Sequence, residues 1–167
     1  ETRGWQVWPY RALFTELLDI DPLAYGDVGA VPESWLPVAR SRLGDVPRDL
    51  DRDAFLDLLM SHCIEPDIQD WGVVFVTDFP PSQAALARKT QVASHSVAAR
   101  FECYVQGREL ANGYWEQADT QLLAERLRAD NARRKHHQLA ERPIDQRLLA
   151  AHHHGLPECA GVALGID

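Results

Sequence analysis

The sequence predicts an α+β fold in which an antiparallel sheet is flanked by helices. Residues 1–70 contain runs whose apolar side chains recur at helical spacing. Short runs rich in β-branched and aromatic residues follow. Between two of them, Gln106-Gly107 suits a tight hairpin turn because Gly tolerates positive φ. We therefore expect a mainly helical insertion or subdomain at 1–70 and a sheet with further helices at 71–167, both within one domain.

Composition favours a globular protein of a reducing compartment. A chain of 167 residues, 46% of them hydrophobic, is long enough to bury a core, and no apolar run approaches the roughly 20 residues of a membrane helix. The formal net charge of −8 argues against a surface that binds nucleic acid by itself. Cys63, Cys103 and Cys159 are too widely spaced for a zinc site. We expect a cytoplasmic protein, and a first residue other than Met predicts the middle of a longer chain.

Three helices are predicted in the first part. The first covers 8–20 and ends at Asp21-Pro22, since a residue that precedes proline disfavours helical geometry. The second covers 33–43. The third covers 51–63, with Asp51 as its N-cap and Glu65-Pro66 closing it.

Strands are predicted at 72–76, 99–105 and 108–116, whereas 84–96 has weak periodicity and is expected to be mostly irregular. A helix at 120–139 follows, with Asp119 at its start. Asp145 caps another helix, which Gly155 ends, and 161–167 is expected to be a strand. The run 152–154 consists of three histidines, but consecutive helical residues do not share a face, so we expect no metal there.

Three carboxylates occur at equal spacing around the hairpin: Glu102, Glu109 and Glu116. A two-residue turn pairs Tyr104 with Glu109 and Glu102 with Ala111, which makes Glu102 and Glu109 diagonal neighbours on one face. Two such carboxylates suit Mg²⁺, which prefers oxygen ligands. The alternative, that they are solvated strand carboxylates, stays open at this point.

Strict alternation leaves Glu116 out of this group. It places Asn112, Tyr114 and Glu116 on the face opposite Glu109. A bulge near 111–113 would bring all of them to one face, and Gly113 would tolerate it. The sequence therefore predicts a bulge if these residues form one site.

The sequence is similar to a known family in three blocks. They are Arg100-Phe101-Glu102, then Gly107-Arg108-Glu109-Leu110-Ala111-Asn112-Gly113-Tyr114-Trp115-Glu116 with Asp119, and Gly155-Leu156-Pro157 followed by Gly161-Val162-Ala163-Leu164-Gly165-Ile166-Asp167. The first two resemble the catalytic core of class II lysyl-tRNA synthetases. The third resembles their motif 3, cut just before its arginine. The resemblance covers nearly the whole chain and implies the C-terminal part of a catalytic domain with a class II synthetase-like antiparallel sheet.

One branch of the family fits best. Canonical synthetases usually carry Gly at the positions of Ala111 and Ala163, whereas the elongation factor P lysine ligases carry Ala at both. The sequence segments 79–87 and 143–146 also resemble that branch. Gln117-Ala118 departs from the usual Leu and small polar residue, with little expected effect because Glu116 and Asp119 are retained.

The resemblance implies roles for individual residues. Glu102 and Glu109 would hold Mg²⁺ on the phosphates of ATP. Glu109, Leu110 and Gly165 would contact ATP. Ala111, Asn112 and Glu116 would bind the amino acid, with Glu116 pairing to an ammonium group and Ala111 shaping the pocket floor. No catalytic residue is assigned within this chain.

The implied reaction is ATP-dependent activation of lysine or β-lysine as an aminoacyl-adenylate and its transfer to a lysine of elongation factor P, by a protein that is a homodimer when intact. Two alternatives stay open: a canonical synthetase that charges the lysine tRNA, and a non-catalytic binding module. Motifs 1 and 2 and the motif 3 arginine do not occur in the sequence, so the fragment alone is expected to be inactive.

Overall fold

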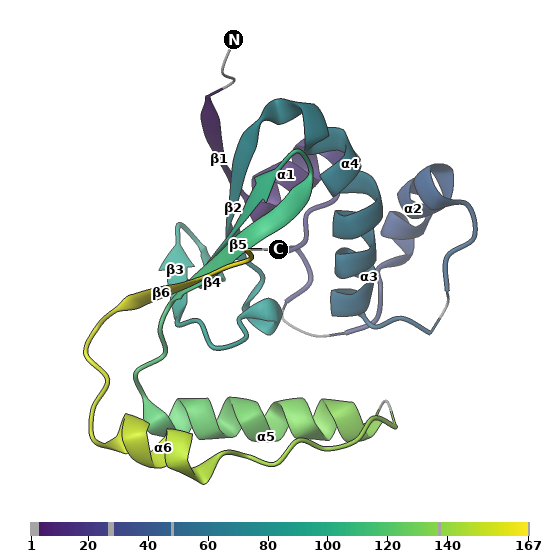
Figure 1. Cartoon of the computed structure of the whole chain (residues 1–167). Coiled ribbons are helices and arrows are strands. Elements are labelled where there is room, and N and C mark those ends of the chain that lie inside the picture. The colour runs from purple at the N-terminus through teal and green to yellow at the C-terminus, as the bar shows by residue number, and fades with distance from the viewer. Residues whose placement is uncertain (1–3, 27–28, 48, 137, 167) are drawn as a thin grey trace.

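A mixed sheet organises the part of the chain that the computed structural model describes, residues 4–26, 29–47, 49–136 and 138–166. Its strand order is β1-β2-β4-β5-β6, and β3 pairs with β4 (Figure 1). Only β1 and β2 are parallel; every other pair among the described strands is antiparallel. The strands are β1 (Trp5–Pro9), β2 (Val73–Phe79), β3 (Lys89–Val92), β4 (His95–Val105), β5 (Arg108–Trp115) and β6 (Ala160–Leu164). The α+β class with helices flanking an antiparallel sheet is confirmed.

The helices fall into two groups. The first packs beside β1 and β2, and the second, α5 and α6, lies together beyond the end of the sheet (Figure 1). The α-helices are α1 (Tyr10–Leu18), α2 (Leu36–Leu43), α3 (Arg52–Leu59), α4 (Glu65–Ile68), α5 (Thr120–His136) and α6 (Gln146–His153). Among the described residues, none of these helices is long and apolar enough to cross a membrane.

The predicted first helix began too early. Trp8 and Pro9 belong to β1, which pairs with β2, and the helix starts at Tyr10. Its end also comes before Asp21-Pro22, because Asp19 turns into the left-handed region with φ 54° and its N–H caps the helix. The segment Trp5–Pro9 therefore belongs to the sheet, although the sheet was expected only within 71–167.

The predicted third helix has the expected start and the wrong end. The Asp51 side chain accepts a hydrogen bond from the Ala54 N–H at 2.9 Å, as an N-cap does. Glu65-Pro66 does not close the helix. A π-helical turn, Met60–Ile64, leads into α4, where Pro66 lies in the first turn and its missing N–H breaks no hydrogen bond.

The segment 84–96 is more regular than predicted. Lys89–Val92 forms β3, and β4 already begins at His95, with Ala93 turning between them at φ 53°. Every residue of β3 is at least partly exposed, so its sequence lacks the apolar alternation by which strands are recognised. The predicted start of β4 at Ala99 was also late, since the strand begins at His95.

Two later helix starts agree with prediction. The Asp119 carboxylate accepts from the N–H groups of Gln121 and Leu122, and Asp145 accepts from those of Arg147 and Leu148. The helix that follows Asp119 ends at His136 instead of 139. The strand predicted at 161–167 is β6, which ends at Leu164; Asp167 lies outside the described residues.

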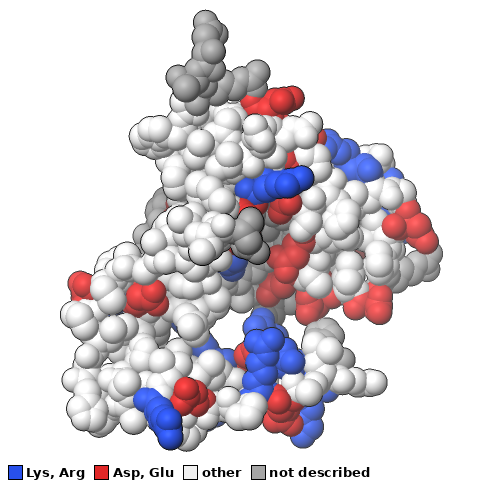
Figure 2. Space-filling model, viewed as in Figure 1, with Lys and Arg blue, Asp and Glu red and all other residues white. Residues whose placement is uncertain are grey.

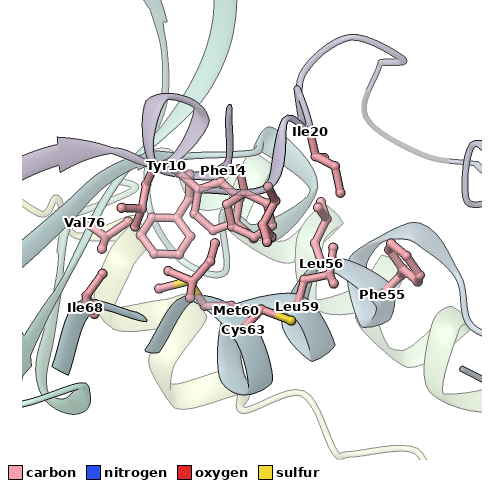
Figure 3. Close-up of a cluster of buried hydrophobic side chains, with 14 of the residues drawn as sticks. Tyr10, Phe14, Ile20, Phe55, Leu56, Leu59, Met60, Cys63, Ile68 and Val76 are labelled. Atoms are coloured by element: carbon pink, nitrogen blue, oxygen red, sulfur yellow. The ribbon is translucent and has the colours of Figure 1, made fainter. Parts of the chain in front are cut away.

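The core lies between the helices and one face of the sheet. Apolar side chains of α1, of α3 and of the π-turn meet Val76 of β2 (Figure 3). Val74 belongs to the same cluster. Phe14 and Leu59 are 0% exposed. Because the core draws on residues from both 1–70 and 71–167, these helices fix the position of β2 and, through it, of β4.

Candidate active site

The hairpin between β4 and β5 has the predicted turn. Gln106 and Gly107 both have positive φ, 53° and 71°, as a two-residue turn of the I′ type requires. A Cβ on Gly107 would overlap the Glu65 carbonyl oxygen, so the turn packs closely on α4. Tyr104 pairs with Glu109, as predicted.

A bulge follows at Leu110. Tyr104 opposes Glu109 while Cys103 opposes Ala111, so Leu110 is the extra residue of β5. The predicted pair of Glu102 with Ala111 is therefore wrong, because Glu102 opposes Asn112. The expected bulge exists, but it lies immediately before 111–113 rather than within that segment. The sequence could not place it because Gly113, which seemed to permit it, is used for close packing instead.

The bulge brings Glu109 and Asn112 to one face of the sheet. The Asn112 side-chain amide donates to Glu109 Oε1 at 3.0 Å, across the extra residue. Glu102, which opposes Asn112, shares that face. On β6, Ala163 opposes Asn112. We refer to this surface of β4, β5 and β6 as the carboxylate face.

Glu116 joins the carboxylate face just after β5. Its N–H donates to the Cys159 carbonyl oxygen at 3.0 Å, which fixes the chain as it leaves the strand. A Cβ on Gly161 would overlap Glu116 Oε1, so the carboxylate lies directly over the backbone of β6. The absence of a side chain at Gly161 leaves room for it.

Leu110 and Gly165 meet through their backbones. The Gly165 N–H donates to the Leu110 carbonyl oxygen at 2.9 Å. This bond lies beyond the regular pairing of β5 with β6, which ends at Ala111 and Leu164. The two residues thus form the edge of the carboxylate face next to the bulge.

Ala111 is the predicted site residue that the structure does not bring to this face. It pairs with Cys103 and Leu164, so its methyl group points to the opposite side of the sheet from Asn112. The family resemblance implied that Ala111 shapes the pocket floor, a role that its orientation in the sheet does not favour. The register gives the position beside Asn112 to Ala163.

Glu102 is held in place from two sides. It is 5% exposed, its Oε1 accepts from the Arg100 guanidinium, and its Oε2 accepts from the Tyr104 hydroxyl at 2.5 Å. Arg100 also donates to the Gln83 carbonyl oxygen at 2.8 Å. Burial and the Glu102 charge raise the pKa of Tyr104, so its hydroxyl stays protonated as a donor. Sequence reasoning missed Arg100 and Tyr104 as partners of Glu102; the alternation of 100, 102 and 104 was the available signal.

Glu65 is a further carboxylate near this face. Burial raises its pKa, and the charges of Glu102 and Glu109 raise it further. The sequence marked Glu65 only as a helix end. The carboxylates of Glu65, Glu102 and Glu109 thus form a region of negative charge where a cation would be stabilised.

The oxygen donors suit Mg²⁺ only when phosphate oxygens complete its shell. Among the described residues, no group of three or more His, Cys, Asp or Glu side chains is arranged to hold a metal. Mg²⁺ is commonly held by one or two carboxylates together with substrate phosphates, which fits Glu102 and Glu109 on one face. Each oxygen of Glu102 already accepts one hydrogen bond and has a second lone pair available.

Comparison with known families agrees with this geometry. The family model described as tRNA synthetases class II (D, K and N) matches residues 32–167. The chain belongs to this family. The match covers β2 to β6 and therefore the whole carboxylate face.

Individual relatives are also similar. An elongation factor P–(R)-β-lysine ligase of Vibrio cholerae is 55% identical over 159 residues, covering 95% of this chain and 48% of the relative. Proteins with the same name from Pectobacterium carotovorum and Edwardsiella ictaluri are 42% identical, covering 97% and 100% of this chain and 49% and 50% of the relatives. The chain thus spans about half the length of the curated relatives that it matches.

Proposed function

We propose that the protein containing this chain activates lysine or β-lysine with ATP and transfers it to a lysine of elongation factor P. The observation that carries the proposal is the bulge at Leu110, which places Glu109 and Asn112 on one face with Glu102. The names of the relatives support the acceptor. The proposal includes a cytoplasmic location and a homodimer for the intact protein.

The proposed reaction divides the carboxylate face into two parts. Glu102 and Glu109 would hold Mg²⁺, which neutralises phosphate charge when bound. Leu110 and Gly165 would present backbone to ATP at the edge of the face. Glu116 would pair with an ammonium group of the amino acid and Asn112 would bind its polar atoms, so that the substrate carboxylate is oriented toward the α-phosphorus of ATP.

The acceptor decides between this proposal and its rival. The full-length protein would be incubated with ATP, Mg²⁺ and labelled lysine or β-lysine, with lysine tRNA and elongation factor P both present. We expect label on the protein factor, and more of it with β-lysine. Label on tRNA alone would contradict the proposal and identify a canonical synthetase, and label on neither would favour a non-catalytic module.

The two alanines give a matched test of the amino-acid pocket. Ala163→Gly is expected to raise the rate with lysine relative to β-lysine roughly 10-fold, because removal of a methyl group beside Asn112 makes room for an amine placed one carbon closer to the carboxylate. Ala111→Gly should lower stability by about 0.5–1 kcal/mol without changing that ratio. The ratio of initial rates with the two amino acids checks this. If Ala111→Gly alone changed this ratio of rates, Ala111 and not Ala163 would line the amino-acid pocket.

A further inference from the structure

A polar cavity adjoins the carboxylate face on its helical side. It has a volume of about 340 Å³ and lies between α1, α3 and β4, with Arg100 and Glu102 forming the wall that it shares with the candidate site. Asp53 and Asp57 contribute from one face of α3, and Asp130 and Arg133 contribute from α5. Figure 2 shows acidic side chains gathered at the centre of the molecule. Basic side chains lie below them, in the part of the view where Figure 1 shows α5 and α6.

Asp57 is the carboxylate in this cavity that lacks a cation. It accepts a hydrogen bond from the Gln83 side-chain amide at 2.9 Å, and within the described ranges no Lys, Arg or His nitrogen lies within 4.0 Å of it. Asp53 differs, because it accepts from Ser82 Oγ at 2.7 Å and has Arg133 at 3.8 Å. One carboxylate oxygen of Asp57 is thus left for a ligand.

Tyr10 provides an independent sign of a ligand in the same cavity. The residue is 1% exposed, and its hydroxyl has no hydrogen-bond partner, which is costly for a buried polar group. The Gln83 side-chain amide, which donates to Asp57 through Nε2, is a polar group next to this hydroxyl but makes no hydrogen bond of good geometry with it. Burial raises the pKa of Tyr10, and the charges of Asp57 and Glu102 raise it further, so the group is a neutral phenol that offers one donor and one acceptor.

We propose that this cavity binds a primary ammonium group, held by the Asp57 carboxylate and the Tyr10 hydroxyl oxygen. A cation is favoured because the lining carries four carboxylates and two guanidinium groups. An ammonium has three donors, which match Asp57, Tyr10 and a further acceptor on the wall.

The identity of the ammonium rests on the proposed function. Lysine and β-lysine each carry two ammonium groups, and Glu116 is assigned to only one of them. The acceptor lysine of elongation factor P carries another. Asp57 and Tyr10 would thus bind an amine that the reaction already contains. It is either an ammonium group of the amino acid or the acceptor lysine of elongation factor P, and the experiment distinguishes these two.

The negative charge of Asp57 lowers the stability of the fold. Burial, with the neighbouring charge of Asp53, raises the pKa of Asp57 to about 6. A raised carboxyl pKa means that its charged form weakens the fold as pH rises from the ordinary value through 6. Asp57→Asn is therefore expected to leave the melting temperature at pH 7 unchanged or higher, so that any loss of binding is not a loss of folding.

The first measurement is direct binding. The full-length protein would be titrated with n-butylammonium chloride and followed by NMR chemical shifts. Asp57→Asn should weaken binding about 10- to 100-fold and Tyr10→Phe should weaken it less, since charge-assisted hydrogen bonds are the stronger ones. Asp67→Asn is the matched control, because Asp67 on α4 pairs with Arg42 outside the cavity. Equal affinities in all four proteins would overturn the proposal.

The second measurement identifies the source. A higher KM for the amino acid in pyrophosphate exchange, with no acceptor present, would assign the cavity to the activated substrate. A higher KM for elongation factor P in the transfer step alone would assign it to the acceptor lysine. If wild-type protein binds butylammonium through Asp57 but shows no lysine-dependent exchange, the proposed function fails while the ammonium site stands.

Discussion

Glu116→Gln is expected to lower kcat/KM for lysine activation about 30- to 1000-fold. The substitution keeps the size of the side chain and removes the charge that would pair with the substrate ammonium. Loss of one partner of a desolvated charge pair costs about 2–4 kcal/mol. The carboxylate lies over the Gly161 backbone with no room to move inward, so its position on the carboxylate face is fixed.

Pyrophosphate exchange with the full-length protein measures this effect. Glu158→Gln is the matched control: its carboxylate is 71% exposed and pairs with Arg88 on the surface, so its loss should change the rate by less than about twofold. The reading of Glu116 as the ammonium partner would be abandoned if the two variants had equal activity.

Gly113→Ala is expected to lower the free energy of unfolding by about 1–3 kcal/mol. A Cβ at this position would overlap the Phe101 ring and lie 2.7 Å from the Gly161 carbonyl oxygen. The ring could turn, but the carbonyl belongs to β6, and moving it disturbs the pairing of Gly113 with Val162. Because β6 also carries Ala163, we expect lysine activation to fall as well.

Urea unfolding of the variant against wild-type protein checks the stability change. Gly4→Ala serves as the control, since its Cβ would meet no atom within 4 Å. An unchanged unfolding midpoint for Gly113→Ala would mean that β6 adjusts freely, and the close packing of β4, β5 and β6 would then not fix the carboxylate face.

The sequence alone determined the features that depend on neighbouring residues. The Gln106-Gly107 turn follows from the steric freedom of Gly, and it set the pairing of Tyr104 with Glu109. The start of α3 at Asp51 follows from a side chain that reaches an N–H group three residues away. The family resemblance rested on the same kind of local pattern and agrees with the match over residues 32–167.

Only the tertiary structure decided which side chains face one another. The position of the bulge at Leu110 depends on the pairing of three strands, and a shift of one residue reverses the face of every side chain that follows. The register thus turns Ala111 away from the carboxylate face and places Ala163 beside Asn112. Asp57 and Tyr10 lie far from Glu102 in sequence, and packing of α1 and α3 on the sheet brings them to one cavity. Such long-range packing leaves no periodic signal in any single segment, because each helix shows only which of its faces is apolar.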